Sequence, residues 1–279
     1  MQSTRRDEIL HLDPKQDCAR IVHLMACYEF PWDMTRSLEI ALFRTFCSPN
    51  ISSLLDKTKE FSARPQQRYD DTDILISELM EWGYDSERGR RSLRRINQQH
   101  GRFEIGNEEF LYVLSTFIFE PIRWNQQFGW RLMSETERLG LFHFWREVGQ
   151  RMGIRDIPED YALFEVFSRE YEAKQFHYVD SNNRVGNAVL GMFCNWFPTP
   201  LKPLVRSSIL ALMDDKVLTA FGFETPSELM RTVVAKGLRG RARVLAYLPK
   251  RRFPRLRTEG KHRSYPQGYI IEKLGPPDR

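Results

Sequence analysis

The residue with the clearest chemical potential in this sequence is His100, which ends a helical pattern. Leu93, Ile96 and His100 stand at i, i+3 and i+7, so they share one stripe of the predicted helix. Gly101 follows and adds no side-chain bulk beside the imidazole. A neutral imidazole is a common iron ligand, although the helix dipole alone also favours a histidine at a helix C-terminus. Spacing therefore makes His100 a candidate ligand and leaves a structural role open.

A second candidate is His143, in the aromatic stretch LFHFW. It fits a core histidine, a hydrogen-bond donor to a ligand, or the ligand itself, and by spacing it competes evenly with the first candidate. We expect His11 and His262 to be solvated, because both lie in polar terminal segments. His177 follows a polar helix end, and His23 fits an ordinary core residue of a short apolar helix.

Arg68 and Thr72 frame the stretch RYDDT near the expected start of another helix. Together they could present a cation and a hydroxyl to one side of a pocket. The simpler interpretation is that Thr72 and the two aspartates, Asp70 and Asp71, cap the helix.

Motifs and composition exclude several other classes. The sequence contains no P-loop, G-x-G-x-x-G, H-E-x-x-H or G-x-S-x-G motif, which argues against nucleotide hydrolases, metalloproteases and serine hydrolases. The four cysteines form no C-x-x-C pair, which argues against a zinc cluster or covalent c-type haem and fits a reducing compartment. The formal charge of +5 is spread over mixed acidic and basic runs, so we expect no nucleic-acid partner.

No stretch predicts a secretory signal or a transmembrane anchor. The longest apolar stretch, 110–122, falls short of the roughly 18 residues that a span requires. We therefore expect a cytoplasmic protein. The basic stretch KRRFPRLR offers peripheral contact with anionic lipid, and a solvated tail is the alternative.

The elements that must position these residues are helices. Apolar residues recur at helical spacing almost throughout, with cap signals at Ser86 and capping-box patterns at Ser134–Glu137 and Thr225–Glu228. Residues 57–69 read as a polar loop that precedes a helix capped by the aspartates, and Pro121 should kink or restart its helix. We expect about ten helices in one all-α domain over residues 1–249, with globin-like or bundle packing, and a basic, loosely structured tail over 250–279.

Four stretches in sequence order carry a family resemblance. RYDDT, SERGRRSLRRINQQHGRF, FLYVLSTFIFEPIRWNQQFGWR and FHFWREVGQRMGIRDIP resemble the MpaB-type oxygenases, which form one superfamily with the latex-clearing protein, a rubber oxygenase. The resemblance is best over residues 40–200.

This resemblance implies an all-α, globin-like helix array around a non-covalent haem b. It places His100 at the position of the iron-ligating histidine, and the R-x-x-x-T spacing of the family at Arg68 and Thr72, on the side where dioxygen binds. The catalytic glutamate of the rubber oxygenase has no clear counterpart, and Glu60 is a weak candidate for it.

The implied function is a haem b-dependent oxygenase that uses dioxygen to cleave or oxidise a hydrophobic, isoprenoid or lipid-like substrate. Arg68 would stabilise developing negative charge and Thr72 would donate a hydrogen bond. The apolar helix around Leu111, Leu114, Phe117 and Ile118 would wall the haem or the substrate. Two alternatives remain open: a haem-binding sensor or carrier without catalysis, and a helical interaction module without a cofactor.

Overall fold

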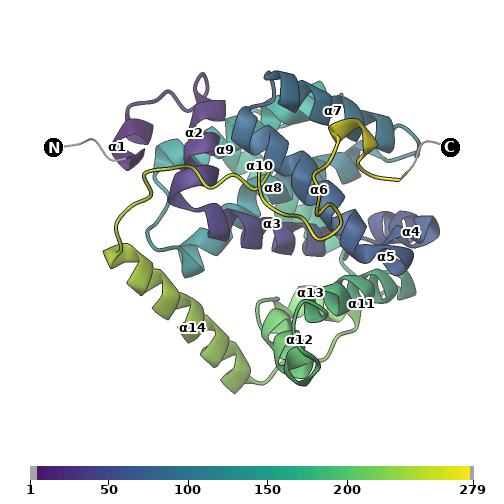
Figure 1. Ribbon diagram of the computed structural model, residues 1–279. Coiled ribbons are helices and arrows are strands. Elements are labelled where there is room, and N and C mark those ends of the chain that lie inside the picture. The colour runs from purple at the N-terminus through teal and green to yellow at the C-terminus, as the bar shows by residue number, and fades with distance from the viewer. Residues whose placement is uncertain (1–4, 277–279) are drawn as a thin grey trace.

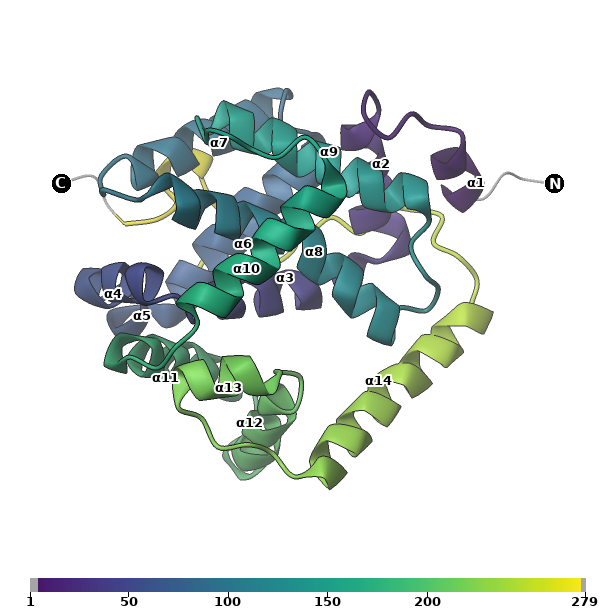
Figure 2. The same cartoon turned by 180° about the vertical axis from the view of Figure 1, so that it is seen from behind.

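The computed structural model describes residues 5–276, and within this range all regular secondary structure is helical. Figures 1 and 2 show the helices from two opposite sides. The predicted all-α, multi-helix array is confirmed. The α-helices are α1 (Arg5–Leu10), α2 (Cys18–Leu24), α3 (Pro31–Thr45), α4 (Pro49–Thr58), α5 (Glu60–Ala63), α6 (Pro65–Trp82), α7 (Glu87–His100), α8 (Asn107–Phe128), α9 (Glu135–Arg151), α10 (Tyr161–Gln175), α11 (Asp180–Cys194), α12 (Lys202–Leu210), α13 (Asp215–Phe221) and α14 (Glu228–Tyr247). A π-helical turn at Met25–Glu29 and short 3₁₀ turns at Thr199–Leu201 and Ile271–Lys273 complete the described secondary structure.

Local capping signals define several of these helices. The Ser86 side chain accepts a hydrogen bond from a backbone N–H in the first turn of α7, as predicted. Ser134 and Glu137 form the predicted capping box of α9, in which each side chain accepts from the other residue's backbone N–H. At α14 the predicted box does not form, because the cap is Ser227, whose hydroxyl accepts from the Met230 backbone N–H, and Glu228 is the first helical residue instead of the third. The caps at Ser86 and Ser134 were predictable because a cap depends on residues only three positions apart.

The start of α6 differs from the prediction. Residues 57–69 are not a loop, because they contain the end of α4, the short α5 and the first turn of α6. The helix begins at Pro65, a residue type suited to the first helical position, where its missing N–H costs no hydrogen bond. The two aspartates that looked like caps lie inside the helix and are buried. Arg68 and Thr72 therefore lie one turn apart on the same face of a continuous helix.

Helix α8 runs through the centre of the array and packs most extensively on α3, with α9 and α10 on its other sides (Figure 1). Pro121 lies within this helix without ending it. Two hydrophobic clusters form around the centre. The first joins α2, α6, α7, α8 and α9, and the second joins the end of α3 to α11, α12 and α13.

The C-terminal segment, residues 250–276, has almost no regular structure, yet much of it is packed on the helices. Figure 1 shows it crossing α6 towards α7. Tyr269 donates a hydrogen bond to Glu78 at 2.6 Å, and Leu274 is fully buried. His262 is also buried, so the expected solvent exposure of this histidine was wrong. Its Nε2 pairs with the Arg257 carbonyl oxygen at 3.0 Å. The expected tail extends to residue 279, and 277–279 lie outside the described residues.

No helix among the described residues has the length and apolar character needed to cross a membrane.

Candidate functional site

A large cavity lies between the two hydrophobic clusters. Its volume is about 1550 Å³, which exceeds the roughly 300–1,000 Å³ of a typical small-molecule pocket. Side chains from α3 to α9 and from α11 line it, and Gly275 and Pro276 of the C-terminal segment complete the wall. The cavity therefore has room for more than one small ligand.

His100 lies in this wall, at the end of α7. The ring packs edge-on against Phe110, with 5.4 Å between the ring centroids. Its Nδ1 is buried and has no hydrogen-bond partner within residues 5–276. Burial, together with the nearby charge of Arg68, lowers the pKa of His100 to about 4, so the imidazole is neutral at pH 7. A neutral, unpartnered imidazole inside a cavity is available to a metal ion.

Gly101, which follows His100, does not line the cavity. A Cβ built at this position would meet the Asn97 carbonyl oxygen at 3.1 Å, in the last turn of the same helix. Only the Gln98 carbonyl oxygen, at 4.0 Å, is also within reach. The glycine thus relieves crowding at the helix end.

Arg68 and Thr72 line the same cavity from α6. The Arg68 guanidinium donates to the Thr72 hydroxyl oxygen, and that hydroxyl donates to the Arg68 carbonyl oxygen at 3.1 Å. The guanidinium lies 5.6 Å from the centre of the Phe61 ring. No carboxylate of the described residues forms an ion pair with Arg68, and burial lowers its pKa. The site thus contains a cation that Thr72 orients and that forms no ion pair with a carboxylate of residues 5–276.

Two carboxylates near Arg68 are engaged elsewhere. Glu60 also lines the cavity, but both of its oxygens accept hydrogen bonds from the Arg64 guanidinium, each at 2.8 Å. Asp71 accepts a hydrogen bond from the Tyr265 hydroxyl, and burial raises the pKa of Asp71. Glu60 is therefore close to the other candidate residues, with its charge already paired.

One face of α8 supplies much of the apolar wall. Phe110, Val113, Leu114 and Phe117 line the cavity, and their spacing of three and four residues follows the helical repeat. Leu114 and Phe117 were predicted for this wall. Leu111 and Ile118 were also predicted for this wall, but they do not line the cavity and are buried in the hydrophobic core of the protein.

The structure places the competing His143 away from this cavity. Its helix contributes Trp145, Val148 and Met152 to the wall, whereas the His143 ring lies near Asp13 of the loop between α1 and α2. Among the described residues that line the cavity, His100 is the single histidine.

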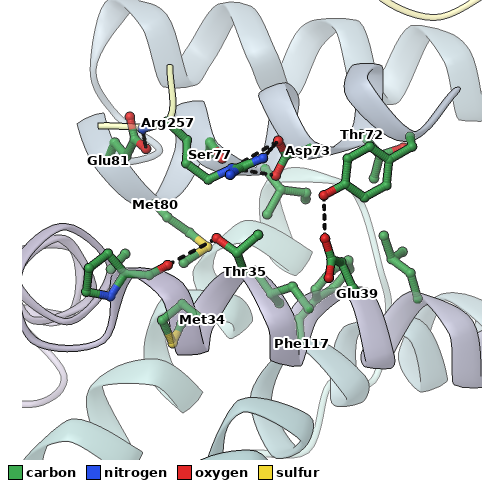
Figure 3. Close-up of a pocket in the computed structure, with 16 residues that line it drawn as sticks. Met34, Thr35, Glu39, Thr72, Asp73, Ser77, Met80, Glu81, Phe117 and Arg257 are labelled. Atoms are coloured by element: carbon green, nitrogen blue, oxygen red, sulfur yellow. Dashed lines mark hydrogen bonds and ion pairs between the residues drawn. The ribbon is translucent and has the colours of Figure 1, made fainter. Parts of the chain in front are cut away.

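Sequence reasoning missed Glu39, which lies where this cavity meets a smaller pocket of about 40 Å³ between α3 and α6 (Figure 3). Glu39 accepts a hydrogen bond from the Tyr69 hydroxyl at 2.5 Å and pairs with Arg36 at 2.8 Å. Burial is the main influence and raises the pKa of Glu39 to about 7. The sequence feature that could have identified Glu39 is its position as an acidic residue within the apolar helical stretch LEIALF.

Within residues 5–276, no three His, Cys, Asp or Glu side chains are grouped so that they could hold a metal ion by themselves. A metal that uses one histidine and takes its other ligands from a cofactor does not require such a group.

Comparison with known proteins gives one family. The family described as "ER-bound oxygenase mpaB/B'/Rubber oxygenase, catalytic domain" matches residues 40–246. The chain is 31% identical over 243 residues to the ER-bound oxygenase mpaB' of Penicillium brevicompactum, covering 80% of this chain and 57% of the relative. It is 33% identical over 211 residues to the ER-bound oxygenase mpaB of the same species, covering 67% of this chain and 53% of the relative. The chain thus spans little more than half the length of these two curated relatives.

Proposed function

This chain belongs to the mpaB/rubber oxygenase catalytic-domain family, and from that membership we propose that it is a haem b-dependent oxygenase acting on a hydrophobic substrate. The substrate class we propose is an isoprenoid or lipid-like chain, with dioxygen as the second substrate. The relatives are named oxygenases; the haem and the substrate class are our proposal.

The observation that carries the proposal is the unpartnered imidazole of His100 inside a large, mainly apolar cavity. A haem is flat and apolar and needs an axial ligand from the protein, and these residues fit it. His100 would hold the iron. Its low pKa means that no proton has to leave the imidazole at neutral pH before the nitrogen binds the metal.

Haem, when bound, would supply the chemistry of dioxygen, and the protein would supply position and charge. Arg68 keeps a positive charge in a site of low polarity, where it stabilises negative charge developing on a reacting oxygen more effectively than it would in water. Thr72 holds the guanidinium in place through its hydroxyl oxygen. Because the Thr72 proton is donated to the Arg68 carbonyl oxygen, we assign Thr72 mainly this orienting role.

The apolar wall would select the organic substrate. Phe110, Val113 and Phe117 offer no hydrogen bonds from their side chains, so they favour a hydrocarbon chain over a polar molecule. The volume beyond that of an ordinary pocket would leave room for such a chain beside the cofactor.

The test is the absorption spectrum of the purified chain after reconstitution with haem. We expect a Soret band for the wild type, loss of most of that band in His100→Ala, and retention of it in His143→Ala, the matched control from α9. Circular dichroism verifies that both variants are folded. A wild-type chain without a Soret band overturns the haem proposal. Loss of haem in His143→Ala with retention in His100→Ala overturns the ligand assignment.

Oxygenase activity is tested separately, as oxygen uptake in the presence of long unsaturated terpenoids and lipids. We expect uptake by the wild type and a decrease of at least tenfold in Arg68→Met, because one charge-stabilising group is worth about 10²–10³ in rate. Haem binding with equal uptake in the two proteins would contradict the role of Arg68.

A further inference from the structure

Helix α14 carries apolar residues both on the side that packs on the protein and on an exposed side. The inner side is half-buried against the rest of the protein and contains Met230, Val234, Leu238 and Leu245. The outer side carries four apolar side chains that are 57–91% exposed, namely Leu229, Val233, Val244 and Tyr247. A helix on the surface of a globular protein usually turns a polar face outward. The outer side therefore requires an explanation that packing within the protein does not provide.

The four exposed residues form one continuous stripe. At about 100° per residue, their positions along α14 fall within an arc of about 60°. Figures 1 and 2 both show α14 at the edge of the molecule, and the exposure of the four residues shows that the stripe is accessible to solvent. We call it the outer stripe of α14.

Positive charge follows the outer stripe. Between residues 229 and 258 the sequence contains ten Lys and Arg residues and no Asp or Glu. Lys236, Arg239 and Arg243 lie along one side of the stripe, are exposed, and form no ion pair with the described residues. By contrast, Arg231 and Arg241 pair with acids of the body. Arg239 also donates from Nε to the Gln127 carbonyl oxygen of α8 at 3.5 Å, and its charge stays without a carboxylate partner among the described residues.

Exposed apolar and basic residues continue just beyond the C-terminal end of α14. Leu248 is 50% exposed and Phe253 is 81% exposed, and Arg251 and Arg252 lie between them. The exposed stretch ends at Arg257, which forms an ion pair with Asp73. Within the basic stretch noted in the sequence, the Lys250 ammonium lies over the Trp130 ring, 3.4 Å from its centroid, and Arg251 and Arg252 are the exposed cations next to Phe253.

We propose that the outer stripe of α14, extended by residues 248–253, docks on an anionic lipid bilayer. The apolar side chains would enter the boundary between headgroups and acyl chains, with Tyr247 at the level of the headgroups. Lys236, Arg239 and Arg243 would lie against lipid phosphates and carboxylates. The positive charge of this surface favours an anionic bilayer over a second copy of the chain as the partner, because two copies joined through this surface would bring like charges together.

The experiment is vesicle co-sedimentation of the full chain at low ionic strength. We expect binding to vesicles of phosphatidylcholine and phosphatidylserine at 3:1, and binding at least tenfold weaker to phosphatidylcholine alone. The variant Val233→Asp/Val244→Asp should bind the mixed vesicles at least tenfold more weakly than wild type. Its matched control is Leu163→Asp/Val166→Asp, which alters two exposed apolar residues of α10 and should bind as wild type does.

A charge variant tests the electrostatic part. Each Lys or Arg at an anionic membrane surface strengthens binding by about fivefold. Replacing Lys236, Arg239 and Arg243 together by Gln should therefore weaken binding to the mixed vesicles by roughly 100-fold. The control replaces three exposed cations elsewhere by Gln, at Arg90, Arg94 and Lys216.

Three results would overturn the proposal. The first is a wild-type chain that does not bind the mixed vesicles, and the second is an equal loss in the stripe variants and in their controls. The third is a concentration-dependent dimer, seen by sedimentation velocity, that Val233→Asp/Val244→Asp dissociates, because the stripe would then be an interface between two copies. All variants are compared by thermal unfolding, so that loss of fold is distinguished from loss of binding. None of these measurements depends on haem or on oxygenase activity.

Discussion

The buried carboxyl of Glu39 gives a quantitative prediction for the variant Glu39→Gln. The pKa of Glu39 is raised from its ordinary value of 4.5 to about 7, mainly by burial, while Arg36 and the Tyr69 hydroxyl partly oppose the shift. Gln has nearly the same shape, and its amide oxygen can still accept from Tyr69, but it carries no charge at any pH. The variant therefore isolates the cost of the buried charge.

The effect of the Glu39 charge on the free energy of unfolding follows from whether the folded or the unfolded chain binds the proton more tightly. Below pH 4.5 the carboxyl is protonated in both the folded and the unfolded chain and costs nothing. As the pH rises towards 7, the unfolded chain releases this proton first, so the folded state loses stability. The two pKa values differ by about 2.5, and at about 1.36 kcal/mol per pH unit the full cost is about 3 kcal/mol, reached above pH 7.

The assay is urea unfolding of the apo chain, followed by circular dichroism at several values between pH 4.5 and pH 8. The free energy of unfolding of Glu39→Gln minus that of wild type should rise by about 3 kcal/mol across this range. The control is Glu159→Gln, whose side chain is 92% exposed, and whose difference from wild type should stay level because it contacts water in both states. A level difference for Glu39→Gln would refute the reasoning, since the carboxyl would then not be desolvated.

Three further substitutions test other parts of the structure. Arg68→Met should raise the unfolding free energy of the apo chain by about 1 kcal/mol, because it removes a buried cation that has no ion pair; a lower urea midpoint would contradict this. Arg44→Met should lower it by about 3–5 kcal/mol, because Glu172 would remain buried without its cation, whereas Glu120 keeps its ion pair with Arg123; a loss below 1 kcal/mol in urea unfolding would be the contrary result. Gly140→Ala should lower the melting temperature, because its Cβ would lie 2.7 Å from the Ile21 side chain, at a cost of about 1–3 kcal/mol; an unchanged melting temperature would show that α2 and α9 can separate cheaply.

Features that depend on near neighbours in the chain were predictable from the sequence. The capping box at Ser134 and Glu137 needs only residues three positions apart. The start of α6 was misplaced because Asp70 and Asp71 are residue types that cap helices. Their actual partners, the backbone of Ser264 and the hydroxyl of Tyr265, lie 194 residues further along the chain. No local pattern shows that these aspartates are held by a distant segment.

In the candidate site, too, the sequence predicts local features but not those that depend on how distant helices pack. Periodicity could place His100 and His143 on helices but could not decide which one faces a cavity, because that depends on how α7 and α9 pack. The family resemblance favoured His100, and the structure places it with Arg68 in one cavity. Glu39 could not be singled out, since its raised pKa comes from burial between two helices that are distant in sequence. The roles assigned to His100, Arg68 and Thr72 in catalysis stay predictions.

The C-terminal segment has a consequence for how this protein is made in the cell. Because Gly275 and Pro276 belong to the cavity wall, the ribosome must synthesise and release residue 276 before the pocket can be closed. Until then Asp70, Asp71 and Glu78 of α6 lack the hydrogen bonds that the C-terminal segment donates, although Gln66 and Arg88 already bind Asp70 and Glu78. A nascent chain can fold its earlier helices first, but it cannot retain a cofactor in a finished pocket. The haem that we propose would therefore be loaded only after residue 276 has left the ribosome.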